Sequence, residues 1–247
     1  MKSSNAVKST GALALMLALA TNLALAGSLN PNPRVLPPGS TPNDLSYGAW
    51  SDAWWTWALS IPADTNPILD PTGANGALGQ SGPVWFLAGV GFGIGPTVER
   101  SLTVPPGKML FFPLVNYVWV NTPQYGDPPW SPEQEAFARG FIGAGIDSAQ
   151  DLTCQVDGKE ITDLMAYRCK TPIGGAEMVT MPDGNLFGIA AGTYGPMVTD
   201  GYYLMLTPLT PGEHTIHFTG GLAGSGPPYN IPPSATMDVT YHLTVGK

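Results

Sequence analysis

Glycine and proline interrupt this chain at short intervals. The 247 residues include 31 glycines and 26 prolines, while 43% of the residues are hydrophobic. Both glycine and proline are unfavourable inside helices, and both supply the backbone angles that tight turns need. Because the hydrophobic content is too high for a disordered chain, the pattern predicts a folded protein of many short strands joined by turns.

Alternating side chains mark the strands of the predicted fold. In residues 97–104 (TVERSLTV), apolar residues and an arginine share one face, while the polar residues share the other. The sequence VDGK at 156–159 is typical of a hairpin turn. About ten such segments occur without a regular alternation of strands and helices. The sequence therefore predicts a mainly β fold, an antiparallel β-sandwich of the jelly-roll type.

The segment WSDAWWTWALSIP, residues 50–62, predicts one Trp-rich helix. Asp44 is a suitable N-cap for a helix over residues 45–60, and Pro62 ends it. Five large side chains fall within a sector of about 80° on this helix: Tyr47, Trp50, Trp54, Trp57 and Ile61. This stripe predicts packing on a sheet, whereas Trp55 projects away from the stripe.

A second, shorter helix is predicted to begin after Ser131. Ser131 is a suitable N-cap, Pro132 occupies the first helical position, and Gln134 completes a capping box. Three glycines after Arg139 are expected to weaken the far end of this helix. We expect both helices at the edge or end of the sandwich.

The first 26 residues have the pattern of a secretory signal peptide. Lys2 and Lys8 form a basic region, an uncharged apolar run follows, and Ala-Leu-Ala at 24–26 is a suitable cleavage site. The apolar run is shorter than the roughly 20 residues of a spanning helix. We therefore predict export to the periplasm or the outside of the cell, with no membrane insertion after cleavage.

Cleavage after Ala26 would leave Gly27 as the first residue. Residues 27–43 contain five prolines and are predicted to form an extended leader. Residues 44–247 show no internal repeat and have a length that suits a single β-sandwich domain.

Acidic residues outnumber basic ones. The chain has 18 Asp and Glu against 10 Lys and Arg, and loss of Lys2 and Lys8 with the signal peptide leaves a net charge of −10. Such a surface repels phosphate backbones and anionic lipids, which excludes nucleic acid as a partner. The sequence carries no signature of an oligomeric state.

Cys154 and Cys169 are the two cysteines of the chain. Because an exported chain leaves the reducing cytosol, we predict a disulfide between them, with two free thiols as the alternative. In the chain-entropy description, a loop of about 16 residues stabilises the fold by roughly 3 kcal/mol.

The histidines offer a candidate metal site. Alternation places His217 on the polar face of one predicted strand, and places Asp238 and His242 together on the polar face of another. If these strands pair, the three side chains form a candidate zinc or copper site. The alternative is a set of polar residues on a solvated sheet face. Asp-Gly turns leave calcium binding open, although none matches an EF-hand loop, and no organic cofactor is indicated.

The sequence GQSGP at 79–83 resembles part of a serine-nucleophile loop, but Pro83 occupies the last position of the GxSxG pattern. Ser81, Asp200 and His217 are the candidate triad, and a glycine loop without catalytic function is the alternative. Glycoside hydrolysis by two carboxylates is a further candidate chemistry. The acids considered for it are Asp52, Asp64, Asp70, Glu99, Asp200 and Glu213.

Several segments resemble a family of exported bacterial proteins of uncharacterised function. The segments are WWTWALSIPADTNPILDPTG, GQSGPVWFLAG, VPPGKMLFFPLVN, VDGKEI with AYR, TDGYYLMLTPLTPGEHTIHF and VTYHLTV, which cover most of the chain after Tyr47. Members of that family often carry cysteines just before GQSG and before VPxGK, near the positions of Gly76 and Ser101 here. The resemblance therefore implies that the family disulfide is absent and that Cys154–Cys169 replaces it. It implies no activity.

Aromatic residues in a chain poor in charge indicate a binding surface. Charged residues make up only 11% of the chain, against about 25% in an average domain. The candidate ligand-binding residues are Trp55, Trp119, Tyr125 and Trp130, because aromatic faces suit sugar stacking. We therefore predict an exported binding or structural module for a neutral ligand, such as a glycan or an apolar surface. The alternative is a secreted hydrolase or metal-dependent enzyme that uses His217 and His242 with nearby carboxylates.

Overall fold

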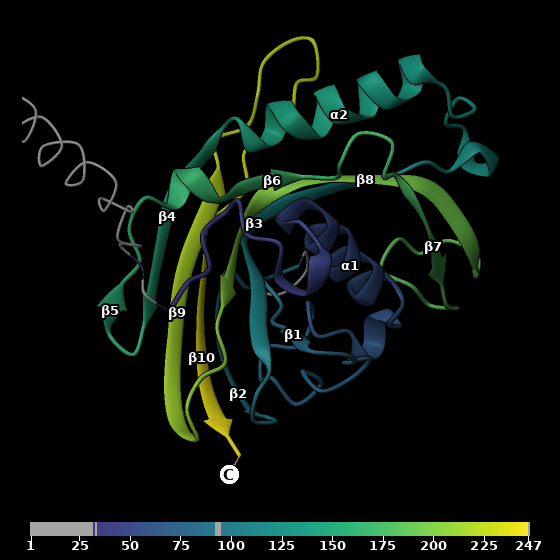
Figure 1. Cartoon of the computed structure of the whole chain (residues 1–247). Helices are drawn as coiled ribbons and strands as arrows, with labels where there is room; N and C mark the ends of the chain where they lie inside the picture. The colour runs from purple at the N-terminus through teal and green to yellow at the C-terminus, as the bar shows by residue number, and fades with distance from the viewer. Residues whose placement is uncertain (1–31, 33, 92–94, 247) are drawn as a thin grey trace, which may run out of the picture. The chain divides into compact units, whose positions relative to one another are not determined.

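The strands of the chain assemble into two mixed sheets (Figure 1). The computed structural model describes residues 32, 34–91 and 95–246, and within them it has ten strands and two α-helices. The strands are β1 Val84–Phe86, β2 Thr97–Val104, β3 Met109–Val120, β4 Ala149–Val156, β5 Lys159–Glu160, β6 Arg168–Lys170, β7 Glu177–Met181, β8 Gly192–Leu206, β9 Gly212–Leu222 and β10 Met237–Val245. The helices are α1 Tyr47–Leu59 and α2 Pro132–Ile146. The predicted mainly β fold is confirmed.

The chain divides into two units, Met1–Pro31 and Asn32–Lys247. The predicted signal peptide, residues 1–26, lies outside the described residues. Within the described part of the chain, no helix is long and apolar enough to span a bilayer.

The first sheet has the strand order β1-β3-β8-β6, and β7 also pairs with β8. The second sheet has the order β2-β10-β9-β4-β5. Two of the pairings are parallel, β1 with β3 and β2 with β10, so the expectation of a wholly antiparallel sandwich was wrong in this respect. Parallel neighbours need long connections, and such connections are hard to see in a sequence of short strands.

One core is shared by both sheets and α1. Phe112 of β3 and Phe218 of β9 place their ring centroids 5.1 Å apart, where the sheets face each other. The tryptophan stripe of α1 is buried in the same hydrophobic cluster. The burial of these side chains confirms the predicted packing of the stripe on α1.

Polar atoms of the stripe are also satisfied. The indole nitrogen of Trp54 donates to the Leu87 carbonyl at 3.0 Å, and that of Trp57 donates to the Leu78 carbonyl at 2.8 Å. Ser46, rather than Asp44, caps the helix, because its hydroxyl accepts a hydrogen bond from the Ala49 amide. The predicted cap was therefore wrong by two residues.

The described part of the predicted leader belongs to the fold. Val35 is buried in the main core and forms an isolated antiparallel bridge with Leu206. The Asn32 side chain exchanges hydrogen bonds with the backbone of Thr162. The expectation of an extended leader outside the core is therefore corrected for these residues.

The two cysteines are free thiols. Cys154 lies in β4 of the second sheet, and Cys169 lies in β6 of the first sheet. The predicted disulfide is therefore absent from the structure. Export and the absence of any other cysteine suggested the pair, but the chain places the two residues in different sheets.

Candidate functional site

Helix α2 lies on the face of the first sheet opposite α1 (Figure 1). Its N-terminus forms as the sequence predicts, because the Ser131 hydroxyl accepts from the Gln134 amide at 3.2 Å. The Gln134 side chain, however, bonds to Asn121 rather than closing the capping box. With 15 residues, α2 is longer than the 13 residues of α1, so the expectation of a shorter second helix was wrong.

A group of aromatic side chains, which we call the aromatic cluster, gathers along one side of α2. Its members come from β3, from α2 and the loop before it, and from the connection between β9 and β10. They are Trp119, Trp130, Phe137, Phe141 and Tyr229. Three separate chain segments thus contribute to one surface.

Four ring pairs of the aromatic cluster meet edge to face, whereas Trp130 packs against the same buried residues as Trp119 and Phe141. The Trp119 ring lies 5.6 Å from the Phe137 ring and 5.4 Å from the Phe141 ring. The Tyr229 ring lies 5.8 Å from both phenylalanine rings. These spacings are the preferred ones for aromatic pairs, so the cluster is a preformed arrangement.

A glycine in α2 allows Tyr229 to approach the helix. A Cβ atom at Gly140 would lie 2.1 Å from the Tyr229 hydroxyl oxygen, far inside a normal contact. Any side chain at position 140 would therefore displace the Tyr229 ring. Gly140, one of the three glycines that predicted a weak helix end, thus allows Tyr229 to pack closely on α2.

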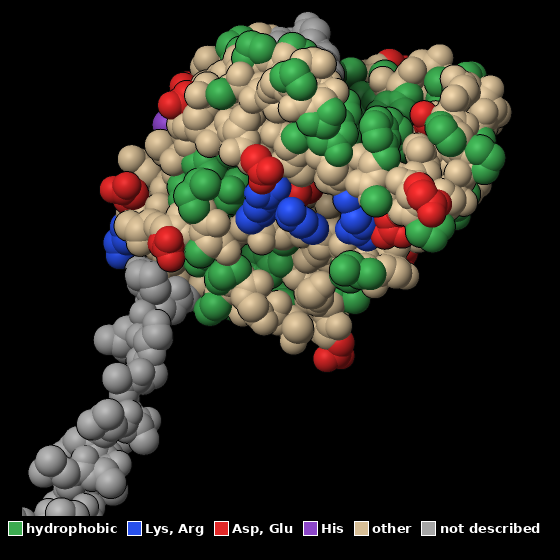
Figure 2. Space-filling model, turned by 90° about the horizontal axis from the view of Figure 1, so that it is seen from above, with side chains coloured by type: hydrophobic (Ala, Val, Ile, Leu, Met, Phe, Trp, Pro, Cys, Tyr) green, Lys and Arg blue, Asp and Glu red, His purple; other side chains and the backbone are tan. Residues whose placement is uncertain are grey.

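The aromatic cluster is partly open to solvent. Phe137 is 47% exposed, and the other members are half-buried. Seen from above, the face that carries α2 shows hydrophobic side chains in patches beside a band of basic and acidic side chains (Figure 2). The rings of the aromatic cluster are therefore accessible to a ligand in the folded protein.

A pocket of about 360 Å³ lies between α2 and the segment that follows β6. Its wall includes Asp200, which is only 1% exposed. Arg168 donates to both Asp200 oxygens, at 2.9 and 2.8 Å, and the Lys170 ammonium lies 3.3 Å from one of them. Burial of this carboxylate is therefore compensated by two cations.

Beneath this pocket, Asp52 of α1 binds two threonine hydroxyls. Thr171 and Thr199 donate to its Oδ1 at 2.5 and 2.9 Å, and both threonines also line the pocket. Burial raises the pKa of Asp52 to about 6, against the lowering effect of these two hydrogen bonds. A carboxyl group with such a pKa titrates near neutral pH.

The predicted ligand-binding aromatics separate into three places. Trp119 and Trp130 belong to the aromatic cluster. Tyr125 is 52% exposed, and its ring contacts Tyr194 of β8. Trp55 is half-buried and packs against two hydrophobic clusters, so the face of α1 that points away from the stripe is covered as well.

The candidate serine triad does not converge among the described residues. Ser81 is exposed in the loop before β1, Asp200 is bound by Arg168 and Lys170, and His217 is bound by Asp238. A triad requires the acid to bind the histidine and the histidine to bind the serine. Asp200 and His217 instead bind other residues.

The histidine site forms only in part. His217 Nε2 and Asp238 Oδ1 lie 2.8 Å apart across β9 and β10. His242 is exposed on the same strand as Asp238 and lies opposite Thr215. Within residues 32, 34–91 and 95–246, no three His, Cys, Asp or Glu side chains are arranged to hold a metal ion.

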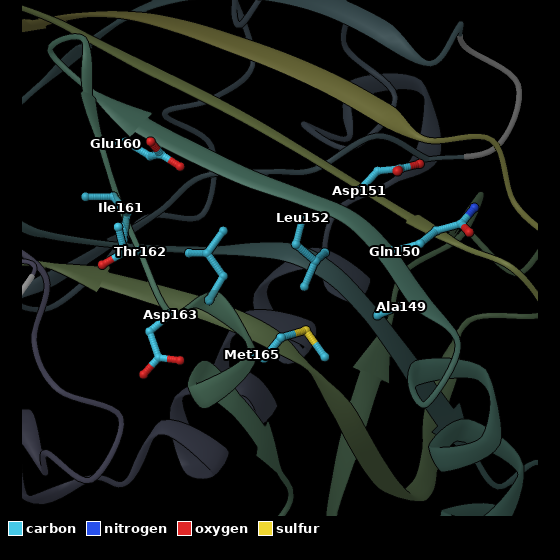
Figure 3. Close-up of a pocket in the computed structure, with 10 residues that line it drawn as sticks. Ala149, Gln150, Asp151, Leu152, Glu160, Ile161, Thr162, Asp163 and Met165 are labelled. Atoms are coloured by element: carbon cyan, nitrogen blue, oxygen red, sulfur yellow. The ribbon is translucent and has the colours of Figure 1, made fainter.

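A second pocket, of about 410 Å³, lies between β4 and the segment after β5. Its carboxylates belong to Asp151, Glu160 and Asp163. Figure 3 shows them spread around the rim, while Leu152 and Met165 lie toward the middle. The acids do not converge on one point, so this pocket offers no binding site for a cation.

Sequence reasoning missed several residues of the site. Phe137 and Phe141 are one turn apart on the predicted second helix, and this aromatic pair was a usable signal. Lys170 and Asp200 meet only because β6 pairs with β8. No local pattern in the sequence reveals that pairing.

Comparison with known proteins assigns no family. No protein-family model and no curated protein matches the chain. A solved structure called "Solution Structure of Amebosin" is similar at 14% sequence identity, over 60% of this chain and 95% of that chain, with a TM-score of 0.16. A TM-score this low carries no argument about fold or function. The family resemblance of the sequence segments stays a prediction.

Proposed function

We propose that this protein is a binding module for a neutral glycan, which it receives on the aromatic cluster beside α2. The observation that carries the proposal is the convergence of half-exposed rings from three chain segments. Two of the aromatics selected from the sequence, Trp119 and Trp130, belong to this cluster. A sugar presents apolar C–H faces that suit such rings.

The ring arrangement favours a ligand that is bound by contact rather than by charge. Phe137, Phe141 and Tyr229 contact one another in the cluster, so their orientation is already fixed. A preorganised surface loses little side-chain entropy when it binds. Aromatic side chains also dominate the energetics of many binding surfaces.

We also infer that the protein works outside the cytoplasm. The basic region, apolar run and Ala-Leu-Ala site of residues 1–26 support a cleaved signal peptide. Extracellular or periplasmic glycans are then available as ligands. Intact mass of the exported protein should place its first residue at Gly27, and retention of residues 1–26 would contradict export by cleavage.

Titration calorimetry with neutral oligosaccharides of glucose, N-acetylglucosamine, mannose and xylose tests the glycan proposal. At least one should bind, and Phe137→Ala should weaken that binding at least about 10-fold, because it removes the most exposed ring. Phe187→Ala is the matched control, because Phe187 is similarly exposed at 43% but lies in the loop between β7 and β8. Absence of binding throughout, or equal losses in both variants, would refute the proposal.

The alternative of a secreted hydrolase or metal-dependent enzyme has less support. The His217–Asp238 pair is its one favourable observation. Because no third metal ligand joins this pair in the described part of the chain, we do not advance it as a second function.

A further inference from the structure

His214 is the most buried histidine of the chain. Its side chain is 7% exposed, whereas that of His217 is 37% exposed and His242 is exposed on β10. On β9 it shares the buried face with Ile216 and Phe218. The residue belongs to the second sheet, whereas the aromatic cluster lies beside α2 on the first sheet. Its role is therefore independent of the glycan proposal.

Both ring nitrogens of His214 face oxygen atoms. Nδ1 lies 2.9 Å from Oδ2 of Asp157, and Nε2 lies 2.8 Å from the carbonyl oxygen of Thr210. Burial acts to raise the pKa of Asp157, but hydrogen bonds from His214 and from the Thr215 amide lower it overall, so this group is an ionised carboxylate. A carbonyl and an ionised carboxylate can only accept, and only the imidazolium carries two N–H groups. The geometry is therefore that of a protonated ring.

The two acceptors belong to different turns. Asp157 lies in the turn between β4 and β5, with a φ angle of +52°, and Thr210 lies in the connection from β8 to β9. The Asp157 Oδ1 accepts from the Thr215 amide at 3.1 Å, and the Asp157 amide donates to the Thr215 carbonyl at 2.8 Å. His214 thus joins the β4–β5 hairpin to the start of β9 and to the turn before it.

A neutral His214 ring could not keep both hydrogen bonds. One of its nitrogens would present a lone pair to the Asp157 carboxylate or to the Thr210 carbonyl, and two acceptors repel each other. The Thr210 hydroxyl lies 3.5 Å from Nε2, and it can donate to a neutral ring once the ring turns toward it. The site therefore has a different hydrogen-bond arrangement for each charge state of the histidine.

The other groups around the ring leave Asp157 as its charged partner. On β10 the residue opposite His214 is Leu243, which is apolar. Glu213 precedes His214 in the chain and lies on the opposite, exposed face of β9. Arg34 acts on the Asp157 carboxylate and favours its ionised form. Among the described residues, the proton on His214 thus determines the strength of its contact with Asp157.

We propose that His214, Asp157 and Thr210 form a pH-sensitive clasp, which holds the β4–β5 hairpin in place when His214 is protonated and releases it when the ring loses its proton. Histidine changes charge between about pH 5 and 8. Because the charge-assisted bond exists only in the protonated form, the clasp is strongest at the acidic end of this range. Glu160 and Ile161, at the end of the hairpin, line the pocket of about 410 Å³, so release of the hairpin would alter that pocket.

Histidine NMR and amide hydrogen exchange between about pH 5 and 8 test the clasp. Two-bond proton–nitrogen correlation follows the charge of each ring, and hydrogen exchange follows the amides of Asp157 and Thr215. When His214 loses its proton, the protection of both amides, corrected for the intrinsic pH dependence of exchange, should fall at least about 10-fold. The proposal is overturned if His214 keeps one charge state over the whole range, or if protection stays constant while the ring titrates.

Asp157→Asn and its matched control Asp238→Asn locate the effect. Asparagine tolerates the positive φ angle of position 157 and still accepts from the Thr215 amide, but it carries no charge. The pH-dependent step in protection should therefore shrink to less than about 2-fold. Asp238→Asn removes the carboxylate partner of His217 in the same sheet and should leave the step unchanged. Equal loss of the step in both variants would show that the pH dependence belongs to the sheet rather than to the clasp.

His214→Gln keeps the test decisive if Asp157→Asn fails to fold. Glutamine retains an N–H donor but cannot gain a proton in this pH range, so the protection of the two amides should no longer change with pH. Persistence of the step in His214→Gln would overturn the proposal.

Discussion

Asp52 is a buried carboxylate that the fold surrounds with hydroxyls rather than with a paired cation. Its Oδ1 receives hydrogen bonds from Thr171 and Thr199, and the Ser51 hydroxyl lies 2.6 Å from that of Thr199. Arg139 favours the ionised form from a distance, and Glu177 opposes it. Burial therefore decides the balance, and it favours the protonated form.

Stability should consequently fall as pH rises through the range in which Asp52 ionises. The pKa is about 6 in the folded protein and 3.8 ordinarily, so the folded state holds this proton more tightly than the unfolded state. Its contribution to stability is full below pH 4 and is lost between pH 4 and 6. The loss amounts to roughly 1–3 kcal/mol at pH 7.

Replacement of Asp52 by asparagine isolates this effect. Asp52→Asn keeps an acceptor for the two threonines and removes the ionisation, so thermal melts should show a higher Tm than the original protein at pH 7 and a similar Tm at pH 4. Asp70→Asn is a control of opposite sign, because folding lowers the pKa of Asp70 whereas it raises that of Asp52. Burial acts to raise the Asp70 pKa, but hydrogen bonds from Asn75 and Thr72 lower it overall. A lower Tm for Asp52→Asn at pH 7 would show that its charge is required.

Trp55 shows how far residue-level reasoning from the sequence can go. Helical periodicity correctly placed Trp50, Trp54 and Trp57 in the core. It also separated Trp55 from them, but it carried no information on what lies beside that face. Val179, Met181 and other residues of β7 and β8 pack in the cluster that Trp55 contacts. Burial of a helix on a second side is a tertiary event.

At the scale of single elements, α2 depends on glycines that a helix would otherwise avoid. Gly145 lies against the Tyr117 ring, where an added Cβ would come within 2.2 Å of a ring carbon. Gly143 has more room, because its nearest neighbour would be an Asp200 oxygen at 3.7 Å. Two glycines of one helix thus have different packing constraints.

Alanine substitution should separate these two glycines. Gly143→Ala should raise stability by about 0.5–1 kcal/mol, because alanine favours the helix and meets no obstacle. Gly145→Ala should lower stability, because the clash with Tyr117 exceeds the helical gain. Urea unfolding of both variants measures the difference. Stabilisation by both would mean that the Tyr117 ring moves freely, and α2 would then be loosely packed.

Individual strands and helices could be predicted from the sequence more easily than the pairings between them. The alternation in residues 97–104 correctly predicted β2, since side-chain alternation is local. The parallel pairing of β2 with β10 joins segments more than 130 residues apart, and no short pattern encodes it. The same limit applies to the aromatic cluster, because Tyr229 joins α2 only when the connection between β9 and β10 folds over the helix.

At the scale of the whole molecule, the two sheets decide the state of the cysteines. Cys154 is paired in register with Phe218 of β9, and Cys169 with Gly201 of β8. A disulfide needs Cα atoms within about 7 Å and directed Cβ atoms. Residues of different sheets meet this requirement only where the sheets touch at these positions, and here both thiols are free.

The protein should therefore contain two thiols even after passage through an oxidising compartment. Burial raises the pKa of the Cys154 thiol to about 12 and raises that of Cys169 as well, so neither forms the reactive thiolate at neutral pH. In the native protein, a thiol reagent should react slowly. After denaturation without a reductant, it should titrate two thiols per chain. Titration of none would show a Cys154–Cys169 disulfide. That outcome would contradict the arrangement in which β4 and β6 belong to different sheets.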